Sequence, residues 1–154
     1  MSFPARPGWP RGAALAAGVF LLAAVVATWP QAAHLRDGLT DVWDAKFTGW
    51  VMHWDFAQTF RDPLRLFHAN IFHPAPYALA FSENLYGAAV FGFPLYAAGV
   101  STLAAYNVLF LLGMALSGVG AWALARALTG DGAAAFLAGL VFAFNPWQLA
   151  QIPH

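Results

Sequence analysis

The chain of 154 residues has no cysteine and very little charge. Without cysteine it cannot form a disulfide framework, a thiolate nucleophile or a zinc–cysteine site. Charged residues make up 9% of the chain, whereas an ordinary soluble domain has about 25%. So few charges cannot cover the surface of a protein of this size, and the composition therefore excludes an ordinary water-soluble domain.

An excess of positive charge is also missing. Seven basic and seven acidic residues give a formal net charge of zero, with a pI near 7.0. A nucleic-acid partner needs a basic patch that neutralises its phosphates. We therefore expect no nucleic-acid partner.

What the sequence does contain is three long runs without charged side chains, over 12–33, 84–125 and 132–153. A helix needs about 20 apolar residues to cross the hydrocarbon core, so these runs have room for one, two and one crossing helices. A secretory signal peptide is the alternative for the first run, because Arg6 and Arg11 precede it. The run is long, however, and no small-residue cleavage site follows it. The sequence predicts an all-α membrane protein with about four transmembrane helices.

The predicted organisation has four parts. We expect a tail over 1–12, transmembrane helix 1 over 13–30, a long polar loop over 31–84, and transmembrane helices 2–4 within 85–154. The later spans are predicted over 85–104, 106–125 and 133–149. Charge alone leaves the orientation open, because the count of basic residues favours a cytoplasmic loop whereas their density favours a cytoplasmic tail.

The polar loop opens with DGLTDVWDAKFTGWVMHWDF, residues 37–56. At 100° per residue this stretch separates into two stripes. The aromatic stripe holds Trp43, Phe47, Trp50 and Trp54. The acidic stripe holds Asp41, Asp44, Thr48 and Asp55. With Thr40 as N-cap, the pattern predicts an amphipathic helix at the membrane surface whose acids face water. The acids are either a solvated face or, with pKa values raised by partial desolvation, candidates for a general base or for ligands of a divalent cation.

The end of the loop holds a further carboxylate and two histidines. Glu83, within SEN, is either a helix cap or a site residue at the entrance to the second span. His68 and His73 are five residues apart, a poor spacing for two ligands on one helix face. We therefore expect no metal site at the histidines.

An ordered series of short motifs runs along 37–154. After the loop tryptophans come LFHANIFHP, FSENLYG, AYN, ALARALTG and LAGLVFAFNP. This series resembles the N-terminal part of the GT-C superfamily of polytopic membrane glycosyltransferases, particularly its large bacterial members. The resemblance implies a multi-pass protein of the bacterial inner (plasma) membrane with a cytoplasmic tail and an extracytoplasmic first loop. It also implies transfer of a sugar from a polyprenyl-phosphate carrier to an acceptor hydroxyl.

The resemblance also implies roles for individual residues. Asp41 best matches the loop aspartate that acts as general base, and Asp37 is the competitor. Glu83 would orient the acceptor or share a divalent cation, which is the cofactor that the resemblance leaves open. Four basic residues are candidates to bind the carrier phosphate, with contacts to phospholipid headgroups as the alternative: Arg36, Lys46, Arg61 and Arg65.

The chain departs from this family in its length. Family members are several times longer, so we expect this chain to be an N-terminal portion that is inactive alone and has the remaining membrane domain as a partner. The alternative is a non-enzymatic four-span membrane partner or a protein that translocates lipid or a sugar carrier. A solute transporter is less favoured, because it would need charge within a span.

Overall fold

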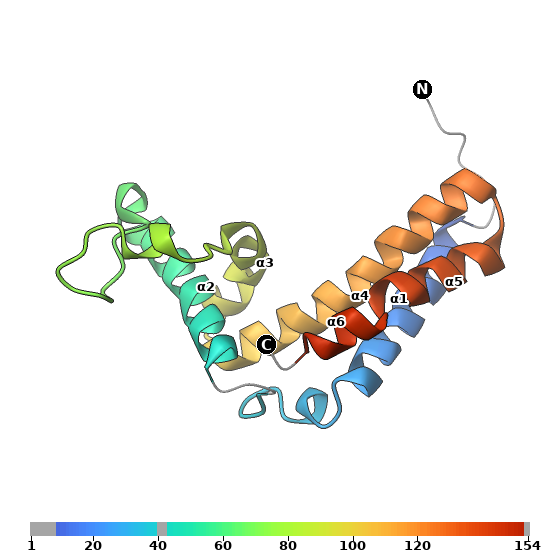
Figure 1. Ribbon diagram of the computed structural model, residues 1–154, viewed down its shortest axis with the longest axis horizontal. Helices are drawn as coiled ribbons and strands as arrows, with labels where there is room; N and C mark the ends of the chain where they lie inside the picture. Colours follow the sequence, from blue (N-terminus) through green and yellow to red (C-terminus); the bar gives the residue numbers. More distant parts are fainter. Residues whose placement is uncertain (1–8, 40–42, 153–154) are drawn as a thin grey trace. The chain divides into compact units, whose positions relative to one another are not determined.

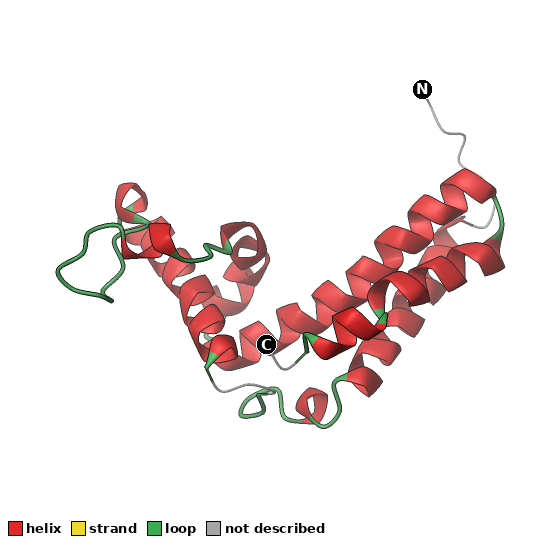
Figure 2. Ribbon diagram, in the orientation of Figure 1, coloured by secondary structure: helices red, strands yellow, loops and turns green. Residues whose placement is uncertain are grey.

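The computed structural model describes residues 9–39 and 43–152, and within these ranges the regular structure is helical, without strands (Figures 1 and 2). The α-helices are α1 (Trp9–Ala27), α2 (Asp44–Arg61), α3 (Tyr86–Ala97), α4 (Thr102–Thr129), α5 (Gly132–Ala143) and α6 (Pro146–Ala150). Three short 3₁₀ helices are η1 (Gln31–Ala33), η2 (Pro63–Arg65) and η3 (Ala78–Phe81). The all-α prediction is confirmed.

Two helical stretches are long and apolar enough to cross a membrane. They are Thr102–Thr129, with a mean hydropathy of 2.0, and Gly132–Ala150, with 1.4. The first apolar run lies in α1, where the apolar part, Gly12–Ala27, is shorter than these two stretches. The structure thus contains two candidate spans, and the predicted four-span topology goes beyond them.

The region predicted as the second span differs from a single crossing helix. α3 has 12 residues and ends at Ala97, so it measures about 18 Å, whereas the hydrocarbon core is about 30 Å thick. Gly99 then adopts a φ of +78°, a left-handed conformation that favours glycine. This turn separates α3 from α4, and α4 extends beyond both ends of the predicted third span.

The chain divides into two compact units. We call them the terminal unit, formed by Met1–Ala33 and Phe110–Pro153, and the loop unit, formed by His34–Leu109. The terminal unit contains α1, most of α4, α5 and α6. The loop unit contains α2, α3 and the beginning of α4.

The core of the terminal unit is built around one phenylalanine. Phe20 of α1 is fully buried, and its ring stacks on Phe136 at 5.4 Å. It also lies against Gly118 of α4 and Gly139 of α5, where an added Cβ would clash with the ring. At Gly139 the added Cβ would also lie 2.7 Å from the Gly118 carbonyl oxygen. The three helices can therefore approach closely only because both positions are glycine.

The loop unit packs on two sides of α2. One buried cluster joins α2 to α3 and the start of α4, through Ala45, Met52, Ala89, Tyr96, Ala105 and Tyr106. A second cluster joins α2 to the segment that ends in η3, through Val51, Ala69, Ala78 and Leu79. α2 is therefore the central helix of the loop unit.

Candidate functional site

The residue that the sequence favours as general base, Asp41, precedes α2 in the sequence. α2 starts at Asp44, with Trp43 as N-cap. Asp41 and the predicted N-cap Thr40 lie outside the described residues. Asp44 lies in the first turn of α2, as predicted. Its side chain is exposed.

Asp55 contradicts the prediction that the acidic stripe faces water. Its exposed fraction is 0%, whereas Trp43 of the aromatic stripe is 82% exposed. The prediction is wrong here because the segment before α3 packs against this side of α2, where Asn84 hydrogen-bonds to Asp55. On the aromatic side of α2, Trp54 Nε1 donates to the Leu66 carbonyl oxygen at 2.8 Å.

The buried carboxylate of Asp55 has one satisfied and one unsatisfied oxygen. Asn84 Nδ2 donates to Asp55 Oδ1 at 3.1 Å, and Oδ2 has no hydrogen-bond partner within the described ranges. Desolvation by burial raises the pKa of Asp55 to about 6 and outweighs the hydrogen bond from Asn84, which lowers it. Asp55 can therefore bind or release a proton close to neutral pH.

Asn84 connects this carboxylate to the start of α3. Its Oδ1 accepts from the Tyr86 backbone N–H at 3.1 Å, in the first turn of α3. The Tyr86 hydroxyl lies 3.1 Å from Thr59 Oγ1, whose own proton goes to the Asp55 carbonyl oxygen at 2.5 Å. The Tyr86 hydroxyl is therefore the donor to Thr59. These bonds fix the segment before α3 against α2.

Two further polar side chains lie where α2 packs against α3 and α4. The ring of Tyr96 is 5.1 Å from that of His53 and 5.5 Å from that of Phe56. The Tyr96 hydroxyl is buried and has no hydrogen-bond partner in the described part of the chain. His53 Nδ1 lies 3.0 Å from Thr102 Oγ1 at the beginning of α4.

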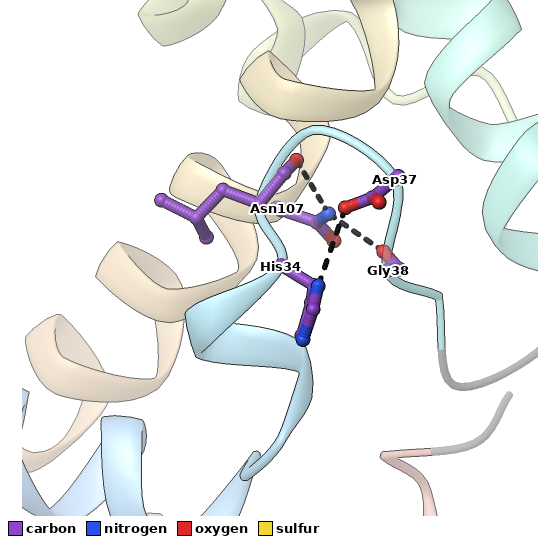
Figure 3. A network of polar contacts seen from close by, with 5 residues as sticks. His34, Asp37, Gly38 and Asn107 are labelled. Carbon is purple, nitrogen blue, oxygen red and sulfur yellow. Dashed lines mark hydrogen bonds and ion pairs between the residues drawn. The ribbon is translucent and has the colours of Figure 1, made fainter.

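Asp37, the competing base, lies on an exposed turn that a buried amide anchors. Asn107 of α4 is fully buried, and its Nδ2 donates to the carbonyl oxygens of Leu35 and Gly38, each at 2.9 Å (Figure 3). Within this turn the Asp37 carboxylate is 3.5 Å from His34 Nδ1, and both side chains are exposed. The backbone of the turn is thus fixed, while the carboxylate remains accessible.

Glu83, like Asp37, lies on a segment that an asparagine fixes. It is exposed and directly precedes Asn84, whose amide is bonded to Asp55 and to the start of α3. The structure therefore holds each exposed carboxylate on a segment fixed by an asparagine. No hydrogen bond or ion pair joins Asp37 to Glu83, both of which are described.

The four predicted phosphate-binding residues are exposed but are not gathered in one place. Lys46 and Arg61 lie near opposite ends of α2. Their separation of 15 residues corresponds to about 22 Å along the helix axis, so one phosphate cannot contact both. Arg65 lies 3.6 Å from Asp62. Arg36 adjoins Asp37 and is therefore the basic residue closest in sequence to a candidate base.

The structure offers no ready cation site in the ranges that it describes. No group of three or more histidine, aspartate or glutamate side chains there could hold a metal ion. His68, one of the two loop histidines, lies with its ring 4.1 Å from the ring of Tyr77. A divalent cation would need ligands beyond these residues.

Sequence reasoning missed the pair Asp55–Asn84. A signal was present, because Asp55 is flanked by Trp54 and Phe56 and both neighbours are apolar, as in a helix covered on more than one side. Asn84 lies in the FSEN segment, directly after the charged residue Glu83. Comparisons of the chain with protein-family models, with curated proteins and with solved structures found no match.

Proposed function

We propose that this chain contributes the first extracytoplasmic loop and the neighbouring membrane helices of a GT-C-type glycosyltransferase. The enzyme would transfer a sugar from a polyprenyl-phosphate carrier to an acceptor hydroxyl. The observation that carries the proposal is the pair of exposed carboxylates, Asp37 and Glu83, on segments that Asn107 and Asn84 anchor. Catalytic groups need this kind of rigid support.

In the proposed reaction, a loop aspartate removes the proton of the acceptor hydroxyl. The acceptor oxygen attacks the anomeric carbon, and the bond from that carbon to the phosphate oxygen breaks. The sugar thereby moves to the acceptor, and the carrier leaves as its phosphate. Asp41 is the proposed base and Asp37 its competitor, Glu83 orients the acceptor or shares a divalent cation, and Arg36 stabilises the leaving phosphate.

Asp55 has a different role in this proposal. It is completely buried, so it does not touch the substrate. Its hydrogen bond to Asn84 holds the segment that carries Glu83. Asp55 is therefore a positioning residue.

The proposed topology is multi-pass in the bacterial inner membrane, with residues 1–12 in the cytoplasm and 31–84 outside it. The region 85–104 is proposed to stay with the loop instead of crossing, because Thr102 Oγ1 at the start of α4 lies 3.0 Å from His53 Nδ1 of α2, and this leaves three of the four expected spans. The two candidate spans over Thr102–Thr129 and Gly132–Ala150 support this proposal.

Sugar transfer by the chain together with its remaining membrane domain tests the function. We expect one of two variants, Asp41→Asn or Asp37→Asn, to reduce sugar transfer about a hundredfold or more. A positioned general base contributes that factor. Asp44→Asn is the matched control, because Asp44 is an exposed acid only three residues after Asp41 in the sequence. Normal transfer by both variants, with normal membrane insertion, would overturn the assignment and favour the non-enzymatic membrane partner.

The orientation can be tested separately with a single cysteine. Ala57 is exposed on α2, and the chain itself contains no cysteine. We expect Ala57→Cys to react with a membrane-impermeant maleimide in intact cells. Reaction only after lysis would place the loop in the cytoplasm, and the proposed extracytoplasmic activity would then be excluded.

A further inference from the structure

The terminal unit contains a recess where α4 is followed by α5. Its volume is about 370 Å³, which lies in the range of small-molecule sites. The apolar walls come from Leu15, Trp122 and Phe136, and the small residues Gly132 and Ala133 leave it open. Arg126 is the charged residue among those that line it. None of the predicted site residues of the loop lines this recess.

The recess lies where two candidate spans meet. Thr102–Thr129 ends and Gly132–Ala150 begins on either side of a two-residue turn. A turn between two crossing helices lies at a membrane surface, because its backbone groups need water or headgroups as partners. The recess therefore opens at the depth of the lipid headgroups, with its apolar walls continuing toward the hydrocarbon.

Two residues of opposite charge lie near this turn: Arg126 lines the recess, and Asp131 directly precedes Gly132, which also lines it. Arg126 Nη1 donates to the Gly130 carbonyl oxygen, which holds the guanidinium at the recess. Asp131 is exposed, and its Oδ1 accepts from the backbone N–H groups of Ala133 and Ala134 at 2.7 and 3.1 Å. These bonds, together with the charge of Arg126, lower the pKa of Asp131, so Asp131 is ionised at neutral pH.

We propose that this recess binds one phospholipid with an ethanolamine headgroup. The lipid phosphate contacts Arg126, its ammonium contacts Asp131, and the upper part of one acyl chain lies along Leu15 and Phe136. A guanidinium matches the geometry of phosphate oxygens. A carboxylate beside it disfavours a purely anionic headgroup and favours an ammonium that carries N–H donors over a choline, which has none. The proposal is independent of the proposed glycosyl transfer.

The test measures lipid retention by the purified full chain in mild detergent. Phosphatidylethanolamine, phosphatidylglycerol and phosphatidylcholine are added in equal amounts, and bound lipid is counted by native mass spectrometry. We expect one phosphatidylethanolamine to be retained preferentially. We expect Arg126→Gln to weaken its binding about tenfold, the usual effect of losing a charge-assisted hydrogen bond.

Two further variants make the outcome specific. Ala133→Leu places a side chain in the recess at an exposed position of α5 and should abolish retention while circular dichroism stays unchanged. Asp131→Asn keeps a capping side chain for α5 but should remove the preference over phosphatidylglycerol. Asn70→Ala, at an exposed position of the loop unit, is the control and should bind like the parent chain. Equal retention of the three lipids, or equal retention by the parent chain, Arg126→Gln and Ala133→Leu, would overturn the proposal.

Discussion

The two units of this chain have different kinds of core. In the terminal unit a fully buried Phe20 fits against Gly118 and Gly139. In the loop unit the buried side chains include Asp55 and Asn107, which hydrogen-bond across the unit. Between helices in lipid there is no hydrophobic driving force, so close packing must provide the attraction. Next to water, specific hydrogen bonds can hold short helices and irregular segments in place.

The largest expected effect is the loss of the terminal unit in Gly139→Leu. The added side chain would collide with Phe20 and with the Gly118 carbonyl oxygen, and a backbone atom cannot move aside as a side chain can. We expect a loss of about 3 kcal/mol or more in the free energy of unfolding, at the upper end for overpacked cores. Thermal unfolding in detergent measures it.

Matched controls for this variant are available on α4. Gly113→Ala and Gly120→Ala place a methyl group where no atom lies within 4 Å. They should leave the melting temperature unchanged or raise it, because alanine favours a helix over glycine by about 1 kcal/mol. Adding Phe20→Ala to Gly139→Leu should recover part of the loss. A melting temperature of Gly139→Leu equal to that of the controls would contradict the packing described for Phe20.

The next largest effect should come from Asn107→Leu, which breaks the loop unit instead. The carbonyl oxygens of Leu35 and Gly38 lose their donor, at an expected total cost of about 3 kcal/mol. Trypsin should then cut faster after Arg36, which lies between these two residues. Asn70→Leu changes an exposed asparagine of the same unit and should stay within about 0.5 kcal/mol. Equal cutting rates in the two variants would show that Asn107 does not anchor the turn.

A smaller effect is expected from Asp55→Asn, which should raise the stability at pH 7 instead of lowering it. The pKa of Asp55 is about 6 in the folded chain against 3.8 for an unperturbed aspartate, so the folded state binds more protons between these values. The stability that this proton uptake contributes is fully present below pH 3.8 and is lost as the pH rises through about 6. At pH 7 the variant should therefore be more stable by about 2 kcal/mol, and its stability should vary less between pH 4 and 6. Unfolding at several pH values checks this, and a less stable variant at pH 7 would show that the charged form is favoured.

The smallest effect should come from Asp131→Ala in the terminal unit. Its carboxylate caps α5 through two backbone N–H groups, which lower its pKa. The stabilisation is present above the unfolded pKa and is lost as the pH falls through the lower folded value. We expect a slightly lower melting temperature at pH 7 and no difference from the parent chain in strong acid. Asp131→Asn should retain the cap at both pH values.

Much of the fold follows from the sequence, because a long apolar run without charge has few alternatives to a helix. A helix was predicted within the stretch 37–56 with Thr40 as N-cap, and the structure has α2 over Asp44–Arg61 with Trp43 as N-cap. The span predicted over 85–104 was harder to place. Its composition is apolar throughout, and only the backbone conformation at Gly99 shows where α3 and α4 separate.

The candidate site was less predictable than the fold. A helical projection assigns Asp55 to a stripe but does not say whether another segment covers that stripe. The covering segment contains Asn84, which lies 29 residues farther along the chain. The anchoring by Asn107 is equally non-local, because its partners precede it by 72 and 69 residues.

The glycine contact of Phe20 also has a consequence for the order of biosynthesis. Phe20 leaves the ribosome long before Gly118 and Gly139, whereas the loop unit is a continuous segment that is complete once Leu109 has been made. The loop unit can therefore assemble while translation continues. Phe20 of α1 therefore lacks one of its two glycine contacts until α5 has been synthesised.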